Sequence, residues 1–135
     1  MNSGLKVTNF SGNRVSSLIL DNKEKVINEV KDSIDVAKKL KCNRIMLLSD
    51  ILQNDGSVKV KSISSEEKLE RLSGNLKALV GLAEKEDIFL VIEPLNTFID
   101  HKNYFLDHFQ KTLKLIQYIN SKYLTILYDI YLCRL

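Results

Sequence analysis

The sequence predicts an α/β fold in which helices cover a parallel sheet. One observation is that short apolar runs, typical of buried strands, alternate with longer stretches whose apolar residues recur every three or four positions. A second is that the order is strand, helix, strand, helix, strand, helix, strand, with no two strands joined by a hairpin. Strands that alternate with helices in this way form βαβ units with right-handed crossovers.

The first predicted strand is LKVTNF, residues 5–10, which ends at the loop sequence Ser-Gly-Asn. A helix follows, and Asp21 is its predicted N-cap. Its apolar residues form one stripe that must be buried against another element. They are Val26, Ile27, Val30, Ile34, Ala37 and Leu40.

The second predicted strand is RIMLLSD, residues 44–50, a continuous apolar run of the kind that is buried on both faces. A polar loop containing Asn54, Asp55 and Gly56 separates it from the second helix. That helix has Ser64 or Ser65 as its N-cap, glutamates in its first turn, and apolar residues at helical spacing. It carries the strongest helix signal in the chain.

The third predicted strand is IFLVIE, residues 88–93, and the fourth is YLTILYDIY, residues 123–131. Between them we predict a helix from about Tyr104 to Ile119. We expect residues 1–135 to form a single domain. Periodicity does not separate an open doubly wound sheet from part of a closed barrel, but no glycine-rich phosphate-binding motif follows a strand, which favours the barrel.

Composition argues against several classes of protein. The net charge of +3 comes from lysines interleaved with acidic residues, so no nucleic-acid partner is expected. Cys42 and Cys133 are too few and too far apart for a disulfide framework or a zinc knuckle, and we expect reduced thiols. No signal layout opens the chain, and no apolar run approaches the roughly 18 residues of a membrane span. We therefore expect a soluble cytoplasmic protein with no membrane partner.

Three predicted strands end on an acid, namely Asp50, Glu93 and Asp129. The ends of parallel strands converge on one face, where chemistry collects. We interpret Asp50 as an acid at the water-exposed mouth or as a cap of the following loop. Glu93 and Asp129 end consecutive strands, so a divalent cation is expected to offset their repulsion. Oxygen ligands suit Mg²⁺ or Mn²⁺, and a neighbouring histidine would widen the choice to Zn²⁺ or Co²⁺.

The loop after Glu93 collects polar side chains. They are Asn96, His101 and Tyr104. In one interpretation they contact a small hydroxy-carbonyl substrate. In the other the loop is solvated, and Asp100 and Asn103 cap the next helix. We expect His108 to lie within that helix on a polar, solvated face.

Three segments, VIEPLNT (91–97), DHKNYFLD (100–107) and LYDIY (127–131), resemble hydroxypyruvate isomerase and the wider group of xylose-isomerase-like sugar isomerases and epimerases. The resemblance implies a partial TIM (β/α)8 barrel, with the four strands as barrel strands 3–6 and three intervening helices. It also implies that Glu93 is both a metal ligand and the catalytic acid/base, and that Asp129 is a metal ligand. The metal would polarise a sugar-like substrate while a carboxylate moves a proton between adjacent carbons through an enediolate.

The chain supplies only part of that family's pattern. A complete barrel has eight βα units and takes about 250 residues. The resemblance implies that a histidine on strand seven and a glutamate on strand eight have no counterpart here, so we expect this chain itself to be inactive. Leu132 stands where the family has a histidine. Because codons such as TTA TGC AGA TTA contain Met-Gln in a shifted reading frame, we hypothesise a frameshift near Leu132.

Other functions remain open at this stage. The chain is a non-catalytic remnant or interaction module in one alternative, and an apurinic endonuclease-like barrel in another. The endonuclease reading requires several metal-binding histidines and a basic groove, whereas the sequence has two histidines and no basic stripe. We also expect self-association, because an incomplete barrel exposes strand edges and apolar faces.

Overall fold

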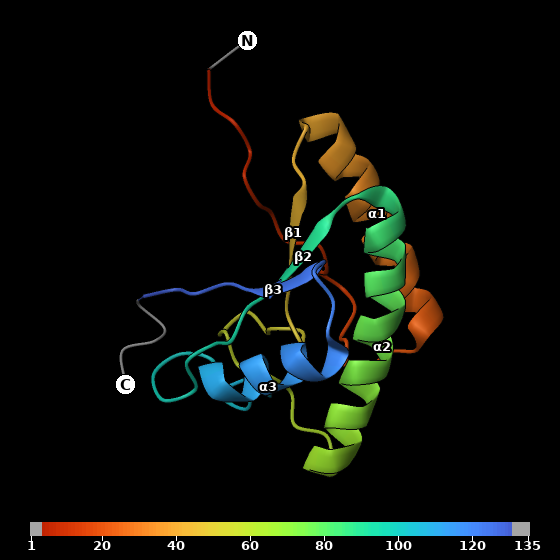
Figure 1. The fold of residues 1–135 in the computed structure, drawn as a ribbon. Coiled ribbons are helices and arrows are strands. Elements are labelled where there is room, and N and C mark those ends of the chain that lie inside the picture. The colour runs from red at the N-terminus through yellow and green to blue at the C-terminus, as the bar shows by residue number, and fades with distance from the viewer. Residues whose placement is uncertain (1–3, 131–135) are drawn as a thin grey trace.

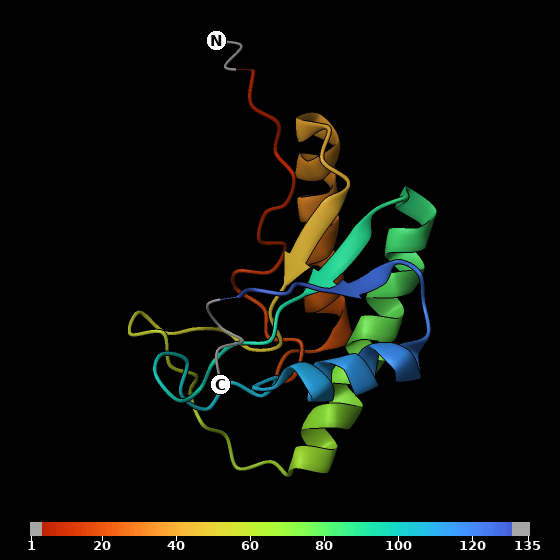
Figure 2. The same ribbon diagram turned by 60° about the vertical axis from the view of Figure 1, so that its left-hand side comes forward.

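The chain forms a three-stranded parallel sheet in the order β1-β2-β3, with its helices packed against it (Figures 1 and 2). The computed structural model describes residues 4–130. In chain order the elements are α1 (Lys23–Leu40), β1 (Arg44–Leu47), α2 (Ser65–Glu86), β2 (Phe89–Ile92), α3 (Phe109–Ile119) and β3 (Leu124–Ile126). Helix α1 packs against β1, α2 against β2, and α3 against β3. The predicted α/β class and the parallel arrangement are confirmed.

The first two helices match their predicted positions, but the cap of α1 differs by one residue. Asn22 is the N-cap, and its side chain accepts a hydrogen bond from the Lys25 N–H (2.9 Å). Asp21 is not the cap, because its carboxylate accepts from the Ser17 N–H (2.7 Å) in the preceding loop. Ser64 caps α2 through the Glu67 N–H (3.1 Å), as one of the two predicted alternatives.

The first predicted strand, residues 5–10, is wrong as a regular strand. The structure has a single parallel bridge in this region, between Ser11 and Met46. It is fixed by bonds from the Met46 N–H to the Phe10 carbonyl (2.8 Å) and from the Gly12 N–H to the Met46 carbonyl (2.7 Å). The earlier residues have β-type composition, but in the structure they are largely exposed and form no ladder, so composition alone does not make them a strand.

Helix α3 begins at Phe109, five residues after the predicted start at Tyr104. His108 is its N-cap residue and makes no side-chain capping bond, so its predicted place within the helix is wrong. Its expected exposure is confirmed, since the side chain is 59% exposed beside the Asp107 carboxylate (3.1 Å). Asp100 and Asn103 lie too far upstream to cap this helix.

The fourth predicted strand is shorter than expected. Its regular part covers Leu124–Ile126, and residues 127–130 follow outside the ladder. Tyr131, Leu132 and Cys133 lie outside the described residues. Cys42 is a buried free thiol. Within residues 4–130 no helix is long and apolar enough to cross a membrane.

Alternation along the strands separates two faces of the sheet. Leu90 and Ile92 of β2 are 0% exposed and form part of the core with Leu76 of α2. Successive strand side chains point to opposite faces. Val91 and Glu93 therefore belong to the face turned away from the helices, the one that lines the interior of a complete barrel.

Candidate functional site

Glu93 and Asp129 lie beyond the ends of neighbouring parallel strands. The Glu93 N–H donates to the Leu47 carbonyl of β1 (3.1 Å), so the backbone at Glu93 is still joined to the sheet. On the other side the Leu127 N–H donates to the Ile92 carbonyl (2.9 Å), which keeps the chain leading to Asp129 beside β2. Both carboxylates therefore belong to the same end of the sheet.

The Glu93 carboxyl is half-buried, and its acidity reflects that environment. Burial raises the pKa of Glu93, and the negative charge of Asp129 raises it further. A positive charge on His101 acts in the opposite direction and lowers the pKa of Glu93. His101 and Asp129 are therefore both within electrostatic reach of this carboxyl, although they come from different loops.

The two carboxylates suit a hard divalent cation in chemical type and charge. Their mutual repulsion is also the kind of unfavourable term that a cation would remove. Among residues 4–130, no group of three or more His, Cys, Asp and Glu side chains is arranged to hold a metal ion. Glu93 and Asp129 supply two carboxylates of the type that magnesium and manganese sites use.

Tyr104 is built into the fold beneath Glu93. Its side chain is 2% exposed, and its hydroxyl accepts from the Ser49 N–H (2.9 Å) while donating to the Glu93 carbonyl (2.9 Å). Burial raises the pKa of the Tyr104 hydroxyl above its usual value, so the proton needed for this donation is retained at neutral pH. Tyr104 therefore ties the ends of β1 and β2 together and fixes the backbone of Glu93.

Asn96 and His101 lie in the loop that follows Glu93. The Asn96 side chain is 6% exposed and accepts from the Phe98 N–H (2.8 Å), and its carbonyl accepts from the His101 N–H (3.0 Å). The His101 ring is half-buried, with Nδ1 3.1 Å from the Gly56 carbonyl oxygen. Asn96 thus shapes the loop, and His101 connects it to the loop after β1.

Asp50 is not at the water-exposed mouth, so that part of its interpretation is wrong. The residue is 5% exposed, and Oδ2 accepts from the Ser49 hydroxyl (2.6 Å) and from the Phe105 N–H (3.0 Å). Burial raises the pKa of Asp50 against the opposing effect of these bonds and of Lys68 and Lys111. The carboxyl holds the loop after β2 and does not cap the loop that directly follows it.

The family model described as xylose isomerase-like TIM barrel matches residues 2–133. The chain belongs to the xylose isomerase-like TIM barrel family. The predicted partial barrel is confirmed by this match and by the three-stranded parallel sheet. No curated protein matches the chain.

Solved structures show the same fold at low sequence identity. A family 2 AP endonuclease from Brucella melitensis is 16% identical, with a TM-score of 0.81 over 96% of this chain and 50% of its own. The 3-keto-D-glucoside 4-epimerase of E. coli is 15% identical, with a TM-score of 0.72 over 91% of this chain and 48% of its own. A xylose isomerase-like barrel from Mycobacterium smegmatis, in complex with magnesium, is 17% identical, with a TM-score of 0.64 over 94% and 42%. The chain spans about half the length of these structures.

Asn13, which the sequence pattern did not single out, joins the N-terminal segment to the end of β1. Asn13 is 4% exposed, and its side chain accepts from the Leu48 N–H (2.9 Å) and donates to the Leu48 carbonyl (2.8 Å). It thereby continues the pairing that the backbone makes between Ser11 and Met46. An asparagine after a strand reads as a loop residue, and nothing in its position signals this role.

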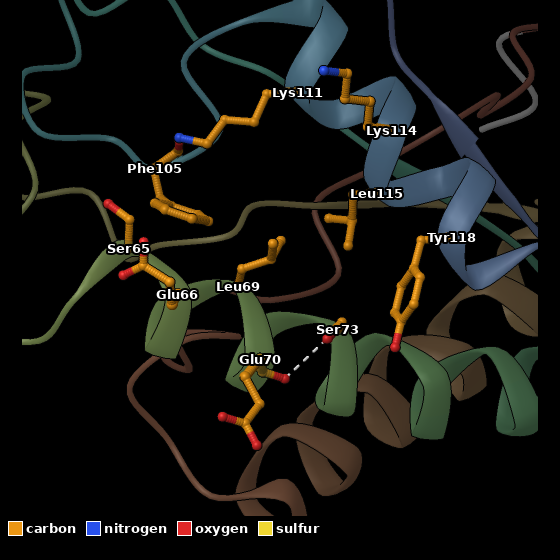
Figure 3. Close-up of a pocket in the computed structure, with 10 residues that line it drawn as sticks. All are labelled: Ser65, Glu66, Leu69, Glu70, Ser73, Phe105, Lys111, Lys114, Leu115 and Tyr118. Atoms are coloured by element: carbon orange, nitrogen blue, oxygen red, sulfur yellow. Dashed lines mark hydrogen bonds between the residues drawn. The ribbon is translucent and has the colours of Figure 1, made fainter.

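A cavity of about 610 Å³ lies on the outside of the barrel half, between α2 and α3 (Figure 3). Its lining is mainly apolar, with Leu69 from one helix and Leu115 and Tyr118 from the other. Lys111 and Lys114 of α3 lie along one side. Phe105, from the loop after β2, also lines it, but Glu93, His101 and Asp129 do not, so it is separate from the candidate site.

Proposed function

We propose that the chain carries part of the active site of a metal-dependent sugar isomerase or epimerase of the hydroxypyruvate isomerase type. The observation that carries the proposal is that Glu93 and Asp129 follow adjacent parallel strands at the same end of the sheet, where the charge of Asp129 raises the pKa of Glu93. Active sites of TIM barrels are built at that end of the strands. The epimerase among the structures of the same fold is in keeping with the proposed substrate class.

In this proposal Glu93 is the acid/base that moves a proton between adjacent carbons of a small hydroxy-carbonyl or sugar substrate. The raised pKa of Glu93 supports the role, because a general acid/base works best when its pKa is shifted toward the operating pH. Glu93 and Asp129 would hold Mg²⁺ or Mn²⁺, with Zn²⁺ or Co²⁺ as further candidates if His101 takes part. When bound, the cation would polarise the substrate's carbonyl and hydroxyl oxygens.

We further propose that this chain by itself binds metal weakly and turns over little or no substrate. The described residues contribute two carboxylates to the site, whereas divalent cations of this kind take about six or more ligands, some of them water. Asn96 and His101 would face the substrate from the loop above Glu93, and Tyr104 would act from below by fixing the Glu93 backbone. A cytoplasmic location and the absence of nucleic-acid and membrane partners belong to the same proposal.

Manganese binding tests the site without requiring turnover. We expect Mn²⁺, followed by electron paramagnetic resonance, to bind the unchanged chain, and binding to weaken in both Glu93→Gln and Asp129→Asn. His108→Gln is the matched control, because it alters an exposed residue that makes no capping bond. Binding that is unchanged in both carboxylate variants would overturn the proposed site.

Hydroxypyruvate isomerisation in the presence of Mn²⁺ or Mg²⁺ then tests the chemistry. The expected result is little or no turnover despite metal binding. If the chain does turn over substrate, Glu93→Gln should lower the rate by about 10²–10⁴-fold, the usual contribution of a general acid/base. Turnover that survives this substitution would contradict the role of Glu93.

A further inference from the structure

The loops that follow β1 and β2 are joined into one wall beside the candidate site. The first loop folds back on itself through an antiparallel bridge between Leu52 and Val58. The Val58 N–H then donates to the Lys102 carbonyl of the second loop (2.8 Å), and the Asn103 side-chain amide donates to the Val58 carbonyl (3.3 Å). Two loops from different strands therefore hold each other in place.

The third link between these loops involves a histidine ring. His101 Nδ1 lies 3.1 Å from the Gly56 carbonyl oxygen. A carbonyl oxygen only accepts hydrogen bonds, so Nδ1 carries the proton in this arrangement. In the neutral ring Nε2 is then left with its lone pair as an acceptor. Gly56 has a φ of +79°, a conformation that favours glycine, so the position of this carbonyl depends on the residue type.

The backbone of His101 is also fixed on both sides. Its N–H donates to the Asn96 carbonyl (3.0 Å), and its carbonyl accepts from the Tyr104 N–H (3.1 Å). Tyr104 is in turn bonded to the Glu93 carbonyl. His101 is therefore held both at its backbone and at the ring atom Nδ1. The residue lies within electrostatic reach of the Glu93 carboxyl.

We propose that the Gly56 carbonyl holds His101 as its Nδ1–H tautomer so that Nε2 accepts a hydrogen bond from a hydroxyl group of the substrate. This inference rests on the proposed function and gives His101 a specificity-determining role within that site. A fixed acceptor recognises a compound that has a hydroxyl beside its carbonyl and gives no such bond to an analogue without one. Hydroxypyruvate and pyruvate differ by that hydroxyl group and are therefore suitable probes.

The tautomer can be measured without any ligand. Nitrogen-15 chemical shifts of the His101 ring, recorded at a pH where the ring is neutral, identify which nitrogen carries the proton. We expect protonation at Nδ1, in contrast to the Nε2–H form that a free histidine side chain favours. Protonation of His101 at Nε2 would overturn the inference and leave the proposed function standing.

Two substitutions separate recognition from a purely structural role. The side-chain amide of His101→Asn occupies the place of Nδ1 and retains a donor for the Gly56 carbonyl, whereas that of His101→Gln occupies the place of Nε2. We expect His101→Asn to weaken hydroxypyruvate binding by about two- to tenfold, as for loss of a neutral hydrogen bond, and to leave pyruvate binding unchanged. His101→Gln should retain more of the preference for hydroxypyruvate. Titration calorimetry with added Mg²⁺ provides the measurement, with His108→Asn as the control.

The outcomes distinguish failure of this inference about His101 from failure of the proposed function. If His101→Gln loses the preference and His101→Asn keeps it, the ring is a structural link and the inference is wrong. If the unchanged protein binds hydroxypyruvate no better than pyruvate, Nε2 does not recognise the hydroxyl. If neither compound binds, both this inference and the substrate class of the proposed function are overturned.

Discussion

Removal of the Tyr104 hydroxyl is the sharpest test of how the site is held. In Tyr104→Phe the Ser49 N–H loses its acceptor and the Glu93 carbonyl loses its donor. Ser49 is 0% exposed, so its N–H has no access to water and costs about 1–3 kcal/mol when unpaired. Glu93 is half-buried, so water replaces part of the hydrogen bond that its carbonyl loses. We expect the free energy of unfolding to fall by about 2–4 kcal/mol in total.

Urea denaturation gives the free energy of unfolding for this comparison. The matched control is Tyr118→Phe, because the Tyr118 side chain is 65% exposed and its hydroxyl only accepts from the Lys77 ammonium (3.2 Å). We expect the control to lie within about 0.5 kcal/mol of the unchanged protein. A Tyr104→Phe variant as stable as the control would show that the hydroxyl does not join the strand ends, and the account of Glu93 given above would fail.

Three further predictions concern the rest of the fold. Burial raises the folded-state pKa of Asp50, so its contribution to stability is present below the ordinary carboxyl pKa and is lost as the pH rises through the raised pKa. Asp50→Asn should therefore gain stability relative to the unchanged protein in urea titrations as the pH is raised above the ordinary carboxyl range. Gly12→Ala would place Cβ 1.9 Å from Ile45 Cγ2 and should cost about 1–3 kcal/mol, whereas Gly81→Ala, with nothing within 4 Å, should be neutral or stabilising. Finally, we propose that the open sheet edges self-associate, so sedimentation velocity should show an average mass that rises with concentration, and a constant monomer mass would contradict it.

The helices and the parallel order could be predicted because their signals are local. Val26, Val30, Ile34 and Ala37 of the predicted stripe are buried as their spacing indicated, whereas Ile27 is partly buried and Leu40 is 44% exposed. The apolar runs around Leu47 and Leu90 form neighbouring strands. Residues 5–10 have the same composition as a strand, yet they pair only where Ser11 reaches Met46. Strand-type composition indicates that a segment can adopt the extended conformation. A regular strand also requires a neighbouring strand to pair with along its whole length.

The candidate site was predictable to the extent that it follows the strands. An acid after an apolar run indicates a strand end, and this pattern predicted Glu93 and Asp129. It holds directly for Glu93, which follows Ile92 of β2, whereas β3 ends at Ile126, three residues before Asp129. The roles of Tyr104 and Asp50 could not be read in this way, because their partners are 55 positions away along the chain. A tyrosine in a polar loop gives the same pattern whether its hydroxyl meets a substrate or a backbone amide.

The late start of α3 and the fixed position of Glu93 have a common physical cause. The apolar residues from Tyr104 to Leu106 extend the pattern of the helix and would continue it in the absence of other bonds. Instead the Phe105 N–H donates to the buried Asp50 carboxylate, and the buried Tyr104 hydroxyl accepts from the Ser49 N–H and donates to the Glu93 carbonyl. Leaving these buried groups unpaired would cost more than the few tenths of a kilocalorie per residue that distinguish helix propensities. Residues 104–108 therefore stay outside helix α3, and the same hydrogen bonds hold Glu93 at the end of β2.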